Sequence, residues 1–296
     1  MSLKRSIAIT SILIIVGFST LVLGFVPNIE RVVTEEIILG AHRGNSLDYT
    51  ENTLEAFQSA LDEDRYRFIE FDIQYTKDKV LVVHHDTSLI RLQQKHQVIE
   101  DLTYEELLNA SDYHIPKYVE VMDLIDGEKP VNIEIKSQGD LLEDKEIVDF
   151  VIRDCIERGV LGGVLISSIS SEVIIYVKEE YPESKTGKVY YVAESTFLNF
   201  DAFTSSLYGE MNKTQADYLM LHGSNLRNYD SLRRLLPEDK TLVIWYFNDE
   251  MYVVQPKEDS WVFKFRSFKE TLGAQGDLIS GRTSAKPSEE ACVWWC

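Results

Sequence analysis

The sequence predicts an α/β protein: a (β/α)8 TIM barrel preceded by one N-terminal transmembrane helix. Short apolar runs alternate with helical patterns over about 250 residues, the usual size of such a barrel. The strand runs are apolar throughout, as expected of parallel strands buried on both faces. Polar residues gather where these runs end, and barrels draw their catalytic groups from the C-terminal ends of several strands.

The N-terminal segment 7–26 has no charged side chain and follows Lys4 and Arg5. An apolar helix of about twenty residues can cross a membrane, and the basic residues before it favour a cytoplasmic start. A cleaved signal peptide is the alternative, but its apolar stretch is usually about 7–15 residues and ends in a small-x-small site, which this segment lacks. We therefore expect a membrane-anchored protein with its catalytic domain extracytoplasmic, or secreted if the segment is cleaved. The predicted parts are an anchor within 1–29, the barrel over 30–285 and a tail over 286–296.

The strand and helix patterns follow one another in barrel order. The run 80–85 directly follows the second strand and is expected to extend it or pair with it. An open doubly wound sheet has the same rhythm, but no glycine-rich phosphate-binding fingerprint follows the first strand. The expected strands are 37–42, 68–76, 131–136, 164–169, 189–193, 217–221, 242–247 and 277–280, and the expected helices are 51–63, 104–109, 119–125, 143–158, 172–180 and 229–236.

Charge excludes one class of partner. The 296 residues carry a formal net charge of −19 and show no basic footprint, so no nucleic acid is expected. Anionic lipid surfaces repel an acidic body, so membrane contact is expected from one segment rather than from a charged face. Of the three cysteines, Cys155 has the spacing of a core-facing helix residue, whereas Cys292 and Cys296 stand too close together to constrain the chain.

Three carboxylates form a candidate metal site. Glu70 and Asp72 are two apart on one strand, so both point to the same face. Buried carboxylates are costly without cations, and Glu134 adds a third on the next strand. Such an oxygen-rich site suits one divalent cation, Ca2+ or Mg2+, rather than zinc. The alternative is a salt-bridge network with Arg43 and Lys136. The metal is favoured because a structural network rarely needs three acids on adjacent strands.

Basic groups surround these carboxylates. His42 and His85 end two apolar runs and suit acid–base work near neutral pH. Arg43 offers a planar fork of donors to phosphate oxygens, and Lys136 a point charge. Glu51 begins the first helix, where a capping role and a role in the substrate pocket are equally open. The combination predicts metal-assisted phosphoryl transfer.

Taken together, the motifs resemble those of the glycerophosphodiester phosphodiesterase family. The resemblance implies a metal-dependent barrel that hydrolyses glycerophosphodiesters to glycerol 3-phosphate and an alcohol. It implies Glu70, Asp72 and Glu134 as metal ligands, His42 and His85 as the acid–base pair, Arg43 and Lys136 on the phosphate, and Glu51 and Trp245 in the substrate pocket. The motifs are His42-Arg43-Gly44, Glu51-Asn52-Thr53, Glu70-x-Asp72, His85-Asp86, Leu89-x-Arg91, Ile115-Pro116, Glu134-x-Lys136 and Trp245.

Two alternatives to an enzyme acting on small glycerophosphodiesters stay open. One is a lysophospholipase D, for which the aromatic stretch 190–203 would line an acyl groove, unless it packs a helix instead. The other is a catalytically silent barrel that binds a phosphodiester. Such a barrel is expected to have lost an acid or a histidine of the set, and this chain has them all.

Overall fold

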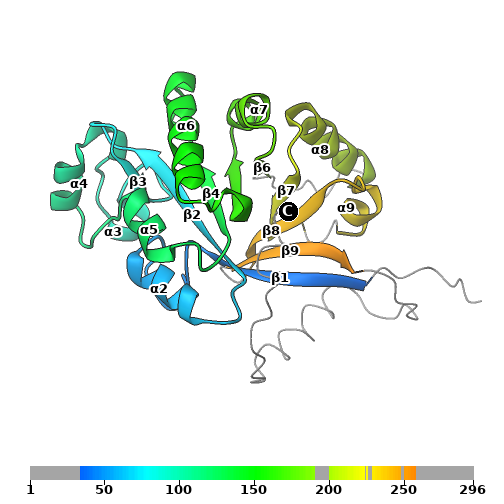
Figure 1. The fold of residues 1–296 in the computed structure, drawn as a ribbon, viewed down its shortest axis with the longest axis horizontal. Coiled ribbons are helices and arrows are strands. Elements are labelled where there is room, and N and C mark those ends of the chain that lie inside the picture. Colours follow the sequence, from blue (N-terminus) through cyan, green and yellow to red (C-terminus); the bar gives the residue numbers. More distant parts are fainter. Residues whose placement is uncertain (1–33, 191–199, 224, 226–228, 248–249, 258–296) are drawn as a thin grey trace, which may run out of the picture. The chain divides into compact units, whose positions relative to one another are not determined.

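The computed structural model describes residues 34–190, 200–223, 225, 229–247 and 250–257 (Figure 1). The chain divides into two compact units, and one of them contains Glu35–Gln255 and nearly all the elements described below. The described residues of the other unit are only the outer ends of the first and last strands. The fold and the site described below belong to the unit that contains Glu35–Gln255.

Eight strands close into a barrel. Around the ring they run in the order β1, β9, β8, β7, β6, β5, β4 and β2, and a further pairing between β2 and β1 closes it. All neighbours from β1 through β2 and β4 to β8 are parallel, whereas β9 is antiparallel to β8. The short β3 (Leu81–Val83) pairs antiparallel with β2 outside the ring. The barrel strands are β1 (Thr34–His42), β2 (Phe68–Tyr75), β4 (Val131–Ile135), β5 (Val164–Ser168), β6 (Lys185–Tyr190), β7 (Tyr218–His222), β8 (Thr241–Phe247) and β9 (Glu250–Lys257).

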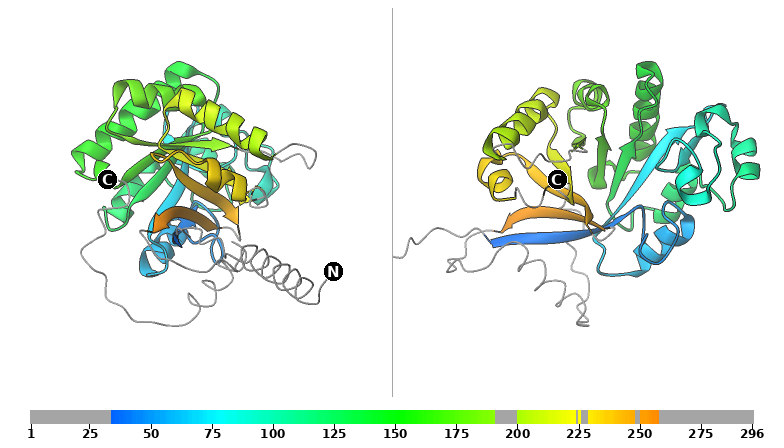
Figure 2. Two further views of the ribbon diagram at one scale, coloured as in Figure 1. Left: turned by 90° about the vertical axis from the view of Figure 1, so that its right-hand side faces the viewer. Right: turned by 180° about the vertical axis from the view of Figure 1, so that it is seen from behind.

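Helices cover the outer faces of the strands (Figure 2). Two apolar layers lie between strands and helices, and a third fills the barrel interior with side chains such as Ile38, Phe68 and Met220. A smaller cluster lies under the insertion between β3 and α5. The helices are α2 (Leu54–Asp62), α3 (Ile90–Gln93), α4 (Tyr104–Ala110), α5 (Tyr118–Ile125), α6 (Leu141–Glu157), α7 (Ser171–Glu180), α8 (Phe200–Thr214) and α9 (Tyr229–Leu235), with 3-10 turns at Ile99–Asp101 and Leu161–Gly163.

The predicted fold class, a (β/α)8 barrel preceded by a transmembrane helix, is wrong as stated: eight strands do close into a barrel, but not as eight parallel strand–helix repeats. After β8 the chain turns back within two residues into the antiparallel β9, which takes the place of an eighth parallel strand. The predicted strand 277–280 lies outside the described residues, as does the predicted span 7–26. In the described part of the chain, no helix has both the length and the apolar character needed to cross a membrane.

The first helices begin where polar side chains can satisfy their free N–H groups. The Thr53 hydroxyl accepts from the Ala56 N–H at the start of α2, and the Asp140 carboxylate accepts from Leu142 and Glu143 at the start of α6. Such caps fix where a helix begins. Both caps lie beyond the C-terminal ends of strands, so each helix start is held next to the barrel mouth.

Gly40 shows how tightly the interior is packed. It lies beside Phe68 in the β1–β2 register, and a Cβ at this position would stand 2.1 Å from the Phe68 ring, which is itself buried. We expect Gly40→Ala to lower the free energy of unfolding by about 1–3 kcal/mol, because the ring has no space to move into. Urea denaturation measures this, with Gly162→Ala as control because no atom lies within 4 Å of its Cβ position. Equal stability of the two variants would contradict the interior packing.

Candidate active site

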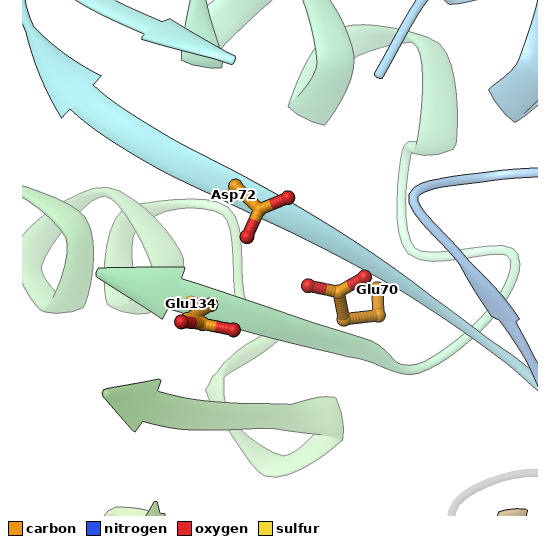
Figure 3. A group of neighbouring side chains, drawn as sticks. All are labelled: Glu70, Asp72 and Glu134. Atoms are coloured by element: carbon orange, nitrogen blue, oxygen red, sulfur yellow. The ribbon is translucent and has the colours of Figure 1, made fainter. Parts of the chain in front are cut away.

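Three buried carboxylates meet at the mouth of the barrel (Figure 3). Glu70 and Asp72 project from β2, and Glu134 lies directly beside Asp72 in the β2–β4 register. One oxygen from each of the three lies within 4.8 Å of the other two. All three side chains are nearly inaccessible to solvent. Because like charges this close repel, the cluster needs positive charge to remain ionised.

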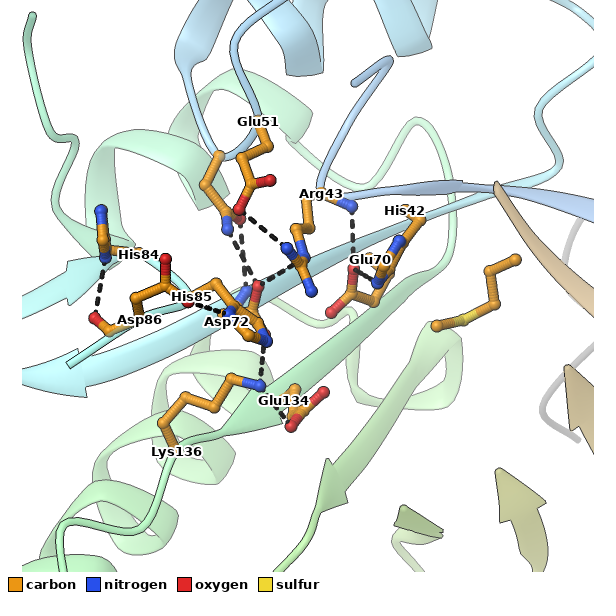
Figure 4. Close-up of polar contacts among 12 residues, drawn as sticks. His42, Arg43, Glu51, Glu70, Asp72, His84, His85, Asp86, Glu134 and Lys136 are labelled. Atoms are coloured by element: carbon orange, nitrogen blue, oxygen red, sulfur yellow. Dashed lines mark hydrogen bonds and ion pairs between the residues drawn. The ribbon is translucent and has the colours of Figure 1, made fainter. Parts of the chain in front are cut away.

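Two cations of the protein supply part of that charge (Figure 4). Lys136 Nζ lies 2.9 Å from Asp72 Oδ1 and 2.6 Å from Glu134 Oε1, and Arg43 Nε lies 3.4 Å from Asp72 Oδ2. Burial alone would raise the pKa of Asp72, but Lys136, His85 and Arg43 hold it well below its usual range. Burial would likewise lower the pKa of Lys136, but Asp72 and Glu134 raise it. Asp72 and Lys136 are therefore an ion pair.

Glu70 has a different environment. Burial, followed by the charges of Asp72 and Glu134, raises the pKa of Glu70 well above its usual value. Its Oε2 accepts from the backbone N–H of Arg43 at 2.8 Å, whereas its buried Oε1 has no hydrogen-bond partner among the residues that the structure describes. An orphaned buried carboxylate oxygen is rare. Facing two further carboxylates, it fits a divalent cation, so Glu70, Asp72 and Glu134 have the donor set and the electrostatic need for Ca2+ or Mg2+.

His42 occupies the last position of β1, next to Glu70 in the register. Its Nε2 lies 3.8 Å from Glu70 Oε2, and burial, then the Arg43 charge, lowers the pKa of His42 well below its usual value. The chain turns sharply after it, with left-handed backbone at Arg43 (φ 59°) and Gly44 (φ 77°). A Cβ at position 44 would stand 2.8 Å from the backbone of Ala56. This turn aims the Arg43 N–H at Glu70.

His85 is held by a chain of charged contacts from outside the barrel. Its Nδ1 lies 2.7 Å from Asp86 Oδ1, and Asp86 Oδ2 accepts from Arg91 Nε at 2.6 Å. Arg91 also donates to both oxygens of Glu51, at 2.5 and 2.8 Å, and Glu51 accepts from Arg43 at 2.8 Å. His85 thus stands on the Asp72 side of the cluster, with its imidazole orientation set by Asp86 (Figure 4).

Removing the Asp86 charge is expected to disturb the orientation of His85. We expect Asp86→Asn to lower kcat by roughly tenfold or more with little change in KM, because a carboxamide no longer fixes one tautomer and orientation of the imidazole. Steady-state kinetics on a phosphodiester substrate measures this, with the exposed Asp123→Asn as control. A rise in KM at constant kcat would show instead that Asp86 serves substrate binding.

The opposite side of the mouth carries aromatic groups. Trp245, near the end of β8, has its ring centre 6.2 Å from that of His42 and 4.8 Å from that of His222. His222 ends β7 and lies beside Trp245 in the register. The rings of Trp245 and His222 therefore line the side of the mouth formed by β7 and β8, across from the charged groups of β1, β2 and β4.

All nine predicted site residues lie at this end of the barrel. His42, Arg43, Glu70, Asp72, Glu134 and Lys136 form one contact network, His85 and Glu51 join it through Asp86 and Arg91, and Trp245 reaches His42. Glu51 binds two arginines; the cap of α2 is Thr53 instead.

Three motif residues to which the sequence assigns no role, Asn52, Asp86 and Arg91, contribute to the site, and so does His222, which lies in none of the motifs. Asn52 Nδ2 donates to Asp72 Oδ2 at 2.9 Å. Arg91 and Asp86 form the series of charged contacts that links Glu51 to His85. His222 was overlooked, although it directly follows an apolar strand run, the same position that His42 occupies.

Comparisons with known proteins agree on one family. A family model described as "Glycerophosphoryl diester phosphodiesterase family" matches residues 42–263. Among solved structures, the glycerophosphodiester phosphodiesterase of Thermotoga maritima is similar with a TM-score of 0.53 and 26% identity, covering 72% of this chain and 87% of that one.

Two curated relatives are similar over shorter stretches. A glycerophosphodiester phosphodiesterase of Caldanaerobacter subterraneus subsp. tengcongensis is 36% identical over 162 residues, 51% of this chain and 65% of that protein. A lysophospholipase D of Homo sapiens is 40% identical over 77 residues, 26% of this chain and 24% of that protein. The chain thus matches less than two thirds of the length of either relative.

Proposed function

Since the chain belongs to the glycerophosphoryl diester phosphodiesterase family, we propose that it hydrolyses glycerophosphodiesters to glycerol 3-phosphate and an alcohol. The observation that carries this proposal is the buried cluster of three carboxylates with a histidine on either side, His42 next to Glu70 and His85 next to Asp72. Two histidines across one charged centre can serve the two ends of an in-line displacement at phosphorus.

Glu70, Asp72 and Glu134 would hold one divalent cation, Ca2+ or Mg2+. When bound, such a cation supplies charge neutralisation for the phosphoryl group and acidifies a coordinated oxygen. Arg43 and Lys136 border the same centre and present donors to phosphate oxygens. This cationic surround stabilises the charge that develops on the phosphoryl oxygens during displacement.

The two histidines divide the proton transfers. Because burial lowers the pKa of His42, its imidazole is neutral near pH 7 and accepts the proton of the attacking hydroxyl, which is the glycerol hydroxyl beside the phosphate. His85, held by Asp86, donates a proton to the leaving alkoxide. In a second step the two histidines exchange roles. His85 accepts a proton from the water that opens the cyclic phosphate, and His42 donates its proton to the departing glycerol oxygen. Each histidine is thereby returned to its starting state.

A second candidate substrate is a lysophospholipid, supported by the likeness to the human lysophospholipase D. The stretch 190–203 contributes little to this argument. Phe203, on α8, packs partly buried against the apolar layer outside the barrel, as a helix residue does, and residues 191–199 lie outside the described part. Phe203 therefore gives no support to an acyl groove in this stretch.

One assay tests the reaction. The purified full chain is incubated with glycerophosphocholine in the presence of Ca2+, Mg2+ or a chelator, and choline and glycerol phosphate are measured separately. Release of both products with a metal ion, and none with chelator, is the expected result. Hydrolysis of lysophosphatidylcholine but not of glycerophosphocholine would favour the lysophospholipid as substrate. No hydrolysis of either substrate with either metal would reject the proposal that the chain is an enzyme.

A further inference from the structure

Exposed apolar side chains are unevenly distributed over the described part of the chain. Of its nine exposed large hydrophobic residues, five follow the C-terminal ends of the parallel strands β1, β4 and β5, and two lie on α3, which an ion pair joins to the segment after β1. The two others, Phe150 and Ile156, lie farther along α6. The described loops at the opposite end of the strands contribute none. Single exposed apolar residues are ordinary, but concentration at one end of a fold marks an interaction surface.

Three pairs of residues make up most of this set, which we call the apolar rim. One pair follows β1, one lies on α3 and one begins α6, and Ile169 after β5 adds a seventh member. The three pairs are Leu47 and Tyr49, Ile90 and Leu92, and Leu141 and Leu142.

Polar contacts fix these segments around the same mouth. The segment after β1 is joined to α3 by the ion pair of Glu51 with Arg91. The start of α6 is joined to the turn after β2 by the ion pair of Lys79 with Glu143. Since β1, β2, β4 and β5 are parallel, their C-terminal ends share one edge of the barrel. The apolar rim therefore lies at the end of the barrel where substrate enters.

The chemistry of the rim indicates what it contacts. Its members are single side chains on four separate segments of the chain, an arrangement that suits insertion of individual apolar side chains into a fluid lipid layer. Exposed acids accompany them at Asp48, Asp140 and Glu172. Together with the net charge of −19, these acids disfavour anionic lipids and suit an outward-facing ammonium group, as in choline lipids.

We propose that the apolar rim contacts the surface of zwitterionic lipid aggregates and so presents amphiphilic substrates to the active site. The inference deepens the proposed function by naming a substrate class, amphiphiles whose cleaved bond lies at a lipid–water boundary. The contact itself does not depend on catalysis. Vesicle binding therefore tests it separately from hydrolysis.

The chain offers a matched pair of variants. Ile169 on the rim and Ile156 on α6 have nearly equal exposure, 56% and 55%. A rim variant carries Leu47→Ser, Leu142→Ser and Ile169→Ser, and a control variant carries Phe150→Ser and Ile156→Ser, with the single variants Ile169→Ser and Ile156→Ser compared in parallel. All these side chains are exposed, so both proteins are expected to fold, which circular dichroism and thermal melting verify.

Two measurements are made on wild type, rim and control proteins: cosedimentation with phosphatidylcholine or phosphatidylglycerol vesicles, and hydrolysis of glycerophosphocholine and micellar lysophosphatidylcholine. We expect wild type and control to prefer phosphatidylcholine vesicles, and the rim variant to bind them at least about tenfold more weakly. The rim variant should keep its rate on glycerophosphocholine and lose rate only on micelles.

Several outcomes would contradict the proposal that the apolar rim contacts lipid. They are equal vesicle binding by rim and control variants, stronger binding to phosphatidylglycerol, and no vesicle binding by wild type. Any of these together with normal hydrolysis of glycerophosphocholine would leave the proposed function intact. Conversely, rim-dependent vesicle binding without hydrolysis of either substrate would reject the proposed function, while the proposal that the apolar rim contacts lipid would stand.

Discussion

Replacing Glu70 by glutamine is expected to abolish divalent-cation binding and hydrolysis while the metal-free protein stays folded. Burial raises the pKa of Glu70 and so favours its neutral carboxyl in the metal-free protein, a form that glutamine resembles in shape and charge. The variant loses one of three anionic ligands, and we expect kcat to fall roughly 10³-fold or more, since a bound cation supplies several kcal/mol to the transition state.

Thermal melting separates loss of the metal from loss of the fold. At a cation concentration 100 times the Kd, wild type should gain about 2.7 kcal/mol of stability, or roughly 5–10 °C in Tm. Glu70→Gln should gain none. The control is Glu128→Gln, the same change at an exposed acid in the loop before β4, at the other end of that strand from Glu134. A Glu70→Gln protein that still melts higher with Ca2+ or Mg2+ would place the metal elsewhere.

Replacing His85 by asparagine is expected to lower kcat by roughly 10²–10⁴-fold on glycerophosphocholine, the usual contribution of a general acid. The loss should depend on the leaving group. A glycerophosphate ester of p-nitrophenol needs no proton on departure, so its hydrolysis should be affected far less. The ratio of the two rates in wild type and variant measures this dependence.

Two further proteins make the His85 experiment decisive. His42→Asn should slow both substrates alike, because it removes the base rather than the acid. The exposed His96→Asn serves as control and should change neither rate. If His85→Asn slows both esters equally, its assignment as the acid is wrong, and if it retains full activity, it has no part in the proton transfers.

Much of the fold is readable from the sequence because parallel barrel strands are continuous apolar runs. Seven expected strands coincide with β1, β2 and β4 to β8 within a few residues. The closing strand is missing from the prediction, which assigns no element between 247 and 277 and takes 277–280 as the eighth strand. Phe247 and Glu250 bracket only Asn248 and Asp249, and two such residues between apolar runs are typical of a hairpin.

The site was predictable where residue type and strand position both carry information. Carboxylates two apart in an apolar strand, such as Glu70 and Asp72, have few explanations other than a shared charged centre. The link from Glu51 through Arg91 and Asp86 to His85 was not predictable. It depends on the direction in which the insertion after β3 folds back, and local patterns do not specify that direction.

The closure of the ring between β1 and β9 bears on the order of folding. Every other pair in the ring joins strands that are near neighbours in sequence, whereas this seam joins the two ends of the described chain. Forming it carries the largest loop-closure entropy of any strand pairing in the barrel. We therefore expect the pairs of sequential strands, including those that carry the charged groups from His42 to Lys136, to form before the β1–β9 seam, which closes last.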